Sequence, residues 1–330
     1  MKRLILAMVA ATATAMATSA ANADPAVIYD MGGKNDKSFN ESAFTGAEQY
    51  KADTGSAYRE FEIQNDAQRE QAMRRFAQDG NEPIVAIGFS QAAALEKVAK
   101  EFPDVKFAIV DMVVDLPNVR SIVFKEHEGS FLVGVLAAMA SQADKVGFVG
   151  GMDIPLIRRF ACGYKGGVKS VDANIEVFEN MTGTTPAAWS DPVKGAELAK
   201  SQFDRGADVV YHAAGGTGIG VLQAAADTGK LGIGVDSNQN YLHPGSVLTS
   251  MLKRVDVAVY NAFKDAKEGA EWGGIHALGL KEGGVGYALD EHNESLVSAD
   301  MKAAVDKAMA DIIAGTVQVH DYMSDSACPY

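Results

Sequence analysis

Residues 28–46 read IYDMGGKNDKSFNESAFTG and lead from an apolar run into a segment with helical spacing. The apolar run ends at Asp30, and residues 31–38 separate it from Phe39, where the helical pattern begins. A plain connection between a strand and a helix takes about two to six residues. This longer one holds two glycines and many hydrogen-bonding side chains, with Phe39 beside them as an isolated aromatic residue. The stretch therefore predicts a strand, a ligand-contacting loop and a helix in succession.

Outward from this stretch, short apolar runs alternate with helical patterns along nearly the whole chain. PAVIYD, PIVAIGF and VKFAIVD are rich in apolar residues and end at turn residues, as buried strands do. The segments between them carry apolar residues every three or four positions, which is typical of helices. Strand–helix–strand repetition of this kind predicts parallel sheets with helices on both faces.

The same rhythm restarts at VRSIVFKEHEG, residues 119–129. No Pro-rich or Ser-rich linker separates the halves, so we expect a short hinge at 124–127. Residues 24–330 are also many for a single core, which favours two lobes. The segments after residue 250 can complete both sheets if the chain crosses between lobes more than once. The expected fold class is α/β, with two lobes facing each other across a cleft.

Residues 1–23 are predicted to be a cleaved signal peptide. Lys2 and Arg3 precede the apolar LILAMVAA, and Ala21-Asn22-Ala23 supplies the small residues that a signal peptidase reads. The apolar run is too short to span a bilayer as a permanent helix. No cysteine lies near the cleavage position, so we expect a secreted protein without a lipid anchor.

The charge of the chain excludes some partners. The formal net charge is -13, and losing Lys2 and Arg3 with the leader makes it -15. A chain this acidic repels phosphate backbones and anionic lipid surfaces. We therefore expect neither nucleic acid nor a membrane surface as a partner.

The chain has two cysteines, Cys162 and Cys328. In an oxidising compartment, such a pair suggests one disulfide. Closing so long a loop is worth roughly 5 kcal/mol in the chain-entropy model. Two buried thiols are the alternative.

Residues that follow the predicted strands are candidates for ligand contact, because ligands of open parallel sheets bind beyond the carboxyl ends of the strands. Acids, small residues and a few aromatic side chains gather there, and basic residues are few. Carboxylates accept paired hydrogen bonds from vicinal hydroxyls and aromatic faces hold a ring, which favours a neutral, polyhydroxylated ligand with a flat apolar part. The candidates are Asp30, Phe39, Asn40, Ser90, Asp111, Met152, Tyr211, Gly216, Asp236 and Lys253.

Structural roles compete with this interpretation. A strand-terminal aspartate such as Asp236 also serves well as a helix cap or a turn residue. Phe39 fits a core position at the helix start, and Tyr211 lies within a strand, where it is equally an ordinary core residue. Trp189, in the polar loop TTPAAWSDP, is either a lid over the site or a cover on the surface.

Catalytic motifs are absent from the sequence. GFSQA lacks the final glycine of a nucleophile elbow, and the six histidines lack metal-type spacing. GGTGIG, residues 215–220, follows a strand, but Val221 stands where a dinucleotide fingerprint needs its last glycine. A glycine turn that presents helix N–H groups to a ligand oxygen explains it as well. We therefore expect no enzyme, cofactor or metal.

Several motifs together resemble one family. DKSFNESAFTG, EHEGSFLVG, GGMDIPLIRRFACGYKGGV, HAAGGTGIGV and GVDSNQNYLHPGSVLTSMLKRVD occur in this order. They resemble the basic membrane protein family, the PnrA-like solute-binding components of ABC transporters. The resemblance implies a type I periplasmic binding fold, with two doubly wound parallel-sheet lobes joined by a three-segment hinge. The expected N-terminal lobe is 24–125 plus 251–283, and the expected C-terminal lobe is 126–250 plus 284–330.

The resemblance also implies a ligand and roles for the site residues. Studied family members bind purine nucleosides, with aromatic rings on the base and carboxylates plus a lysine on the ribose. Phe39 matches one stacking ring, with Asp30 and Asn40 beside it, and Asp236 and Lys253 match the ribose-binding pair. Tyr211 is expected as the opposing ring, with His212 or Trp189 as alternatives; Ser90, Asp111 and Met152 are cleft candidates without assigned roles.

The function implied is capture of a purine nucleoside by lobe closure and its delivery to an ABC permease in the inner membrane. Many relatives are lipoproteins, and because this chain lacks their lipobox cysteine, the resemblance implies a soluble, monomeric periplasmic protein. Asn238 stands where relatives often carry an acid, so the contacts to the ligand hydroxyls are open to change. The alternatives are a binding protein for a free purine base or a sugar, and a secreted α/β enzyme acting on nucleosides.

Overall fold

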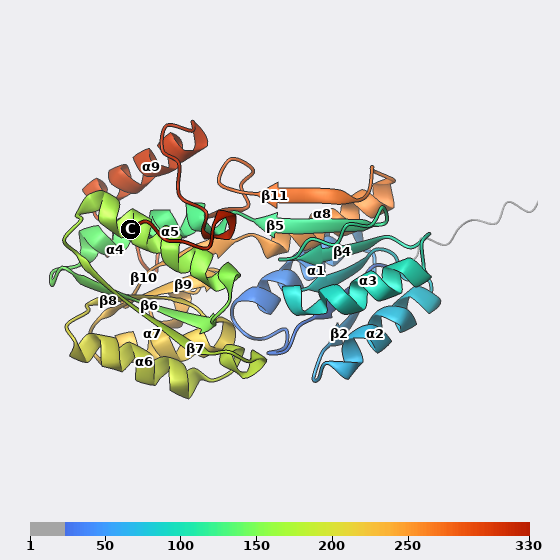
Figure 1. Ribbon diagram of the computed structural model, residues 1–330, viewed down its shortest axis with the longest axis horizontal. Coiled ribbons are helices and arrows are strands. Elements are labelled where there is room, and N and C mark those ends of the chain that lie inside the picture. Colours follow the sequence, from blue (N-terminus) through green and yellow to red (C-terminus); the bar gives the residue numbers. More distant parts are fainter. Residues whose placement is uncertain (1–23) are drawn as a thin grey trace, which may run out of the picture.

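The computed structural model describes residues 24–330, and the predicted signal peptide lies outside this range. Two six-stranded sheets, each covered by helices, form two lobes that lie side by side (Figure 1). The first lobe contains β1 (Ala26–Tyr29), α1 (Phe39–Thr54), β2 (Arg59–Glu62), α2 (Ala67–Gln78), β3 (Ile84–Ile87), α3 (Ala92–Glu101), β4 (Phe107–Val110), β5 (Val119–Phe124), α8 (Val255–Glu268) and β11 (Gly274–Leu278). The second contains α4 (Glu126–Ala140), β6 (Lys145–Met152), α5 (Pro155–Val171), β7 (Glu176–Gly183), α6 (Pro192–Asp204), β8 (Val209–Ala213), α7 (Gly218–Asp227), β9 (Leu231–Asp236), β10 (Val247–Lys253), β12 (Val285–Tyr287) and α9 (Ala299–Ile313).

Both sheets consist mainly of parallel strands. The first has the order β11-β5-β4-β3-β1-β2, and all of its pairs are parallel. The second has the order β12-β10-β9-β8-β6-β7, with β12 antiparallel to β10. The sequences IVAI of β3 and FAIV of β4 are completely buried, because a parallel sheet is covered on both faces. The predicted alternation of strands and helices in two α/β lobes is confirmed.

Three chain segments connect the lobes. The first lies between Phe124 of β5 and Glu126 of α4, and the second between Lys253 of β10 and Val255 of α8. The third, residues 279–284, joins β11 to β12. The expected boundary at 250/251 is wrong, because it cuts β10. That strand pairs with β9 and β12 of the second sheet as far as Lys253, so the chain leaves the second lobe only after this residue.

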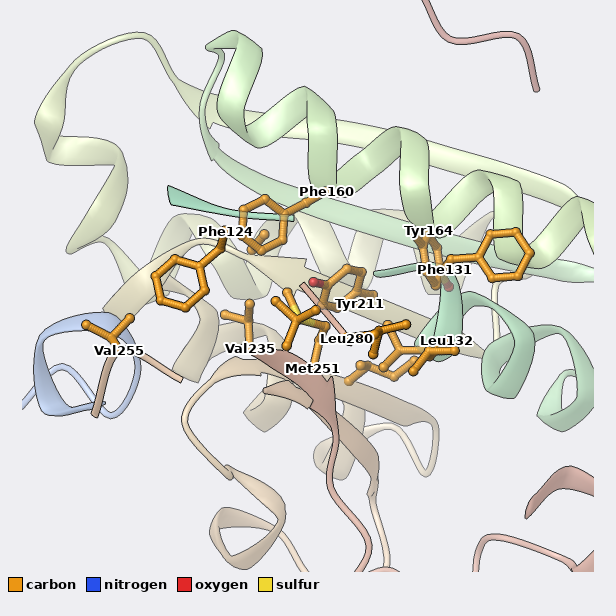
Figure 2. Packing of buried hydrophobic residues seen from close by; sticks show 14 of the residues in the cluster. Phe124, Phe131, Leu132, Phe160, Tyr164, Tyr211, Val235, Met251, Val255 and Leu280 are labelled. Atoms are coloured by element: carbon orange, nitrogen blue, oxygen red, sulfur yellow. The ribbon is translucent and has the colours of Figure 1, made fainter. Parts of the chain in front are cut away.

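The apolar core continues from one lobe to the other through the hinge. Its largest cluster of buried side chains includes Val27 of the first sheet and Met251 of the second. Figure 2 shows Phe124 and Val255, which flank two of the hinge segments, in the same cluster as Val235 at the end of β9. Apolar packing therefore fixes the hinge segments against both lobes.

The C-terminal segment, residues 314–330, returns from α9 to α5 and is the dark red chain in Figure 1. Cys328 near its end forms a disulfide with Cys162 of α5, with the two Cα atoms 5.6 Å apart. The predicted pair of cysteines is thus joined. Among the helices of residues 24–330, none has the length and apolar character needed to cross a membrane.

Candidate ligand-binding site

A cavity lies between the lobes, beyond the carboxyl ends of strands from both sheets. It encloses about 640 Å³ of space not filled by atoms, part of it open to solvent, and about 70 Å³ of this admits the centre of a water-sized sphere. Seven of the sequence-predicted residues line it: Asp30, Phe39, Asn40, Asp111, Trp189, Asp236 and Lys253. The remaining lining residues are Met31, Asp36, Gly88, Phe89, Leu156, Ile157, Phe160, Ala213, Gly215 and Val235.

The long loop after β1 is organised by Asp36. Its carboxylate accepts hydrogen bonds from the backbone N–H groups of Ser38 at 2.9 Å, Asn40 at 3.0 Å and Glu41 at 3.0 Å. These groups lie at the start of α1, where N–H groups lack partners within the helix. Burial raises the pKa of Asp36, although these hydrogen bonds act against the shift. The polar loop therefore fixes the first turn of α1, which begins at Phe39.

Asp30 is held by the first lobe. Its carboxylate accepts hydrogen bonds from the Arg69 guanidinium at 2.6 Å and from the Ser90 hydroxyl. The backbone N–H of Asp30 donates to Asn40 Oδ1 at 3.0 Å. A Cβ at Gly88 would come within 2.8 Å of Asp30 Oδ2, so this strand end needs glycine. Asp30 and Asn40 thus form a rigid polar edge beside Phe39.

The loop after β1 also bonds to the second lobe. The Ser38 hydroxyl donates to the Asp236 carboxylate, and the Ser237 hydroxyl donates to the Ser38 carbonyl at 2.8 Å. The Gln239 amide donates to the Lys37 carbonyl at 2.9 Å. These hydrogen bonds join the two lobes beside the cavity, so the structure is in a closed arrangement.

Lys253, the last residue of β10, brings a buried cation to the cavity. Its side chain is 2% exposed, and its Nζ lies 2.7 Å from Asp111 Oδ2 and 3.0 Å from Glu126 Oε1. The same atom lies 5.1 Å from the ring centroid of Phe39. Burial acts to lower the pKa of Lys253, but the carboxylates of Asp111, Glu126 and Asp236 outweigh it and raise the pKa. The ammonium therefore stays charged beside an aromatic wall.

Two carboxyl groups complete the polar end of the cavity. Asp111 directly follows β4 and Asp236 is the last residue of β9, and both have positive φ angles, 69° and 63°, which aspartate tolerates at a modest energetic cost. Burial raises the pKa of Asp236 to about 7 and that of Asp111 to about 6, although Lys253 lowers both. Asp111 Oδ1 is buried and has no hydrogen-bond partner within residues 24–330. The carboxyl oxygens of Asp111 and Asp236 can accept hydrogen bonds from hydroxyl groups of a ligand.

Trp189 forms the second-lobe wall of the cavity. It ends the short helix η2 (Pro186–Trp189), whose Ala188 carbonyl accepts a hydrogen bond from the Thr217 hydroxyl at 2.8 Å. A Cβ at Gly151 would lie 2.0 Å from Cζ3 of the indole, so the ring rests directly on this glycine. Phe39 of the first lobe and Trp189 of the second therefore line one cavity.

Four predicted residues do not line the cavity. Tyr211 is wrong as a wall residue: it is completely buried, packs against Phe148 and Tyr164, and lies in the core cluster of Figure 2. His212 is also completely buried and bonds to Gln239. Besides Tyr211, the residues outside the lining are Met152, Ser90 and Gly216. Ser90 donates a hydrogen bond to the lining residue Asp30, and Gly216 follows the lining residue Gly215 in the chain.

Sequence reasoning missed several residues of the site. Asp36 carried a usable signal, because an acid just before a helix start is a typical cap. Phe160 carried none, since an apolar residue on an amphipathic helix looks like core. Glu126 is completely buried behind Lys253, yet in sequence it is one of several charged residues near the hinge.

Two doubly wound lobes, three connections and a cavity between them define a hinged ligand-binding protein. Within residues 24–330, no group of three or more His, Cys, Asp or Glu side chains is placed to hold a metal ion. The aromatic and acidic side chains that line the cavity suit an organic ligand.

Comparison with known proteins gives the family. Residues 24–322 match the family described as ABC transporter substrate-binding protein PnrA-like, and the chain belongs to it. It is 35% identical over 317 residues to the ABC transporter nucleoside-binding protein BmpA of Lactococcus lactis, covering 89% of this chain and 88% of that protein. It is 35% identical over 286 residues to an uncharacterized lipoprotein of Pyrococcus abyssi, covering 82% and 70% of the two chains. A solute-binding protein of an ABC transporter system from Aeropyrum pernix K1 superposes with a TM-score of 0.81 at 32% identity, covering 90% of this chain and 92% of that one. The expected family and the periplasmic binding fold are confirmed.

Proposed function

We propose that this protein captures a purine nucleoside between its lobes and delivers it to an ABC permease in the inner membrane. Membership of a substrate-binding family supports a small-molecule ligand and a permease partner. The nucleoside is supported by the name of the Lactococcus relative and by the chemistry of the cavity.

One observation carries the proposal: the aromatic residues Phe39 and Trp189 line the same cavity as the charged residue Lys253 and its carboxylate partners. The Lys253 ammonium is 5.1 Å from the centroid of Phe39 and also contacts Asp111. A base between Phe39 and Trp189 would place its attached pentose near Asp236 and Lys253. Stacking of a base on an aromatic side chain contributes about 1–3 kcal/mol. Because the rings come from different lobes, the ligand stabilises the closed form.

The charges favour a nucleoside over a nucleotide. Lys253 is already matched by Asp111 and Glu126, and Asp236 adds a further carboxyl group. A phosphate group would meet these acids without a free cation beside them, whereas neutral hydroxyl groups can donate hydrogen bonds to them. The polar end therefore suits an unphosphorylated pentose.

A periplasmic location and a monomeric state belong to this proposal. The Cys162–Cys328 disulfide supports an oxidising compartment. Release from the membrane after cleavage of residues 1–23 is a prediction from the sequence, and size-exclusion chromatography and mass spectrometry of the secreted protein test it together with the oligomeric state.

The test is a ligand panel on protein that has been unfolded, washed and refolded to remove any bound compound. Thermal shift and calorimetric titration should find binding of purine nucleosides, with weaker binding of purine bases, sugars and nucleoside monophosphates. Phe39→Ala should weaken nucleoside binding at least about tenfold, through lost stacking, without unfolding the chain. Preference for a free base or a sugar would contradict the proposal, and conversion of the nucleoside to a product would favour an enzyme.

A further inference from the structure

A row of five alternating charges leads from the cavity to the C-terminal segment. Lys253 contacts Asp111 at 2.7 Å and Glu126 Oε1 at 3.0 Å. Glu126 Oε2 accepts a hydrogen bond from Arg159 Nη1 at 2.9 Å. Arg159 in turn donates to Asp321. These contacts connect the hinge to residue Arg159 of α5 and, through it, to Asp321 in the C-terminal segment.

Arg159 is the junction of this row. Its Nε and Nη2 donate to the two carboxylate oxygens of Asp321 at 2.7 and 2.8 Å, a paired geometry that fixes the guanidinium plane. Its Nη1 also donates to the carbonyl of Phe124, the last residue of β5, at 2.8 Å. The Arg159 side chain is 14% exposed and the Glu126 side chain 1% exposed. The Arg159–Glu126 pair is therefore largely shielded from water and from salt, whereas the Asp321 side chain is 31% exposed.

The C-terminal strap, residues 314–330, is held where it supplies Asp321. The Asp321 carboxylate caps the short helix η5 (Tyr322–Ser324) by accepting from the Met323 N–H at 2.9 Å. Beyond it, Cys328 is bonded to Cys162, three residues after Arg159 on α5. Residues three apart on a helix share a face. Figure 1 shows the strap lying along α5 toward the hinge.

We propose that the C-terminal strap positions the cavity lysine Lys253 through Asp321, Arg159 and Glu126. Glu126 is completely buried, and its contact with Lys253 is an ion pair without hydrogen-bond geometry to Oε1. Arg159 Nη1 donates to Glu126 Oε2 and so holds this carboxylate with Oε1 3.0 Å from the Lys253 ammonium. A shift of Arg159 would therefore move the negative charge that attracts the ammonium. The inference rests on the proposed function only in taking Lys253 as a ligand contact.

The test compares Asp321→Asn with Asp325→Asn, a matched control in the same strap. Asp325 is exposed and bonds to His320 and the Ala327 N–H, outside the row of charges. The NMR signal of the Lys253 ammonium in ligand-free protein, assigned by its loss in Lys253→Arg, should move in Asp321→Asn. Affinity for inosine or adenosine should fall about three- to tenfold. Asp325→Asn should leave the signal in place and the affinity within about twofold.

Removal of the disulfide provides the second perturbation. The double variant Cys162→Ala, Cys328→Ala frees the strap, and the Lys253 signal and the affinity should change in the same direction as in Asp321→Asn. An unmoved Lys253 signal in Asp321→Asn would overturn the proposal, as would a moved signal with unchanged affinity. If the unaltered protein binds no nucleoside, the proposed function fails, and the ammonium signal alone decides whether the strap positions Lys253.

Discussion

Gly151 of β6 offers a direct test of the second cavity wall. A Cβ at this position would lie 2.0 Å from Cζ3 and 2.4 Å from Cε3 of Trp189. Carbon atoms in contact are about 3.5–4.0 Å apart, so Gly151→Ala must move the indole by roughly 1.5 Å. Overpacking of this kind costs about 1–3 kcal/mol in unfolding free energy. Displacement of a stacking ring should also weaken binding of a purine nucleoside about tenfold.

Calorimetric titration measures the affinity, and fluorescence reports the position of Trp189. The chain has two tryptophans, so the fluorescence is recorded in a Trp272→Phe background. Gly183→Ala is the matched control, because its Cβ would meet Ala188 of the same loop at an ordinary 3.6 Å. Unchanged fluorescence in Gly151→Ala would refute the steric argument. Changed fluorescence with unchanged affinity would refute Trp189 as a ligand wall.

Two further predictions concern the buried charges. Lys253→Met should lower the unfolding free energy by about 3–5 kcal/mol at pH 7, because Asp111 and Glu126 lose their buried cation. The loss should shrink near about pH 5 as Asp111, whose pKa burial raises to about 6, takes up a proton, and equal losses in urea titrations at both pH values would contradict this. Burial raises the pKa of Asp236 to about 7 from an ordinary 3.8, so the folded state holds this proton more tightly than the unfolded state does. The stability that the proton contributes is full below about pH 4 and is lost as the pH rises through about 7. The unfolding free energy of the unaltered protein relative to Asp236→Asn should therefore fall over this range, and a flat difference would show the pKa to be ordinary.

The parts of the site that the sequence predicted are those set by strand ends. Asp30, Asp111 and Asp236 each follow a buried apolar run, and in a parallel sheet all such ends lie on the same edge. The loop before Phe39 was also recognisable, since it is too long for a plain connection. Local patterns were sufficient for these residues, because each one depends on its own strand or loop.

Tyr211 and Trp189 show where local patterns fail. All five residues of β8 are buried, so the strand sequence does not reveal which side chains point toward the cleft. The position of Trp189 depends on Gly151, which belongs to another strand. Likewise, the contact between Arg159 and Asp321 joins residues 162 positions apart. Tertiary packing alone decides such contacts.

The hinge explains why the cavity combines a fixed part with a part assembled on closure. Lys253 ends β10 at one crossing between the lobes, and Glu126 begins α4 at another. Residues at a pivot move least when lobes rotate, so we expect the ion pairs around Lys253 to persist in an open form. The hydrogen bond from Ser38 to Asp236 joins the lobes outside the crossings and must break on opening. Lys253, together with Asp111, would then bind one end of the ligand in the open form. The rings of Phe39 and Trp189, which belong to different lobes, would both contact the ligand only when the cleft closes.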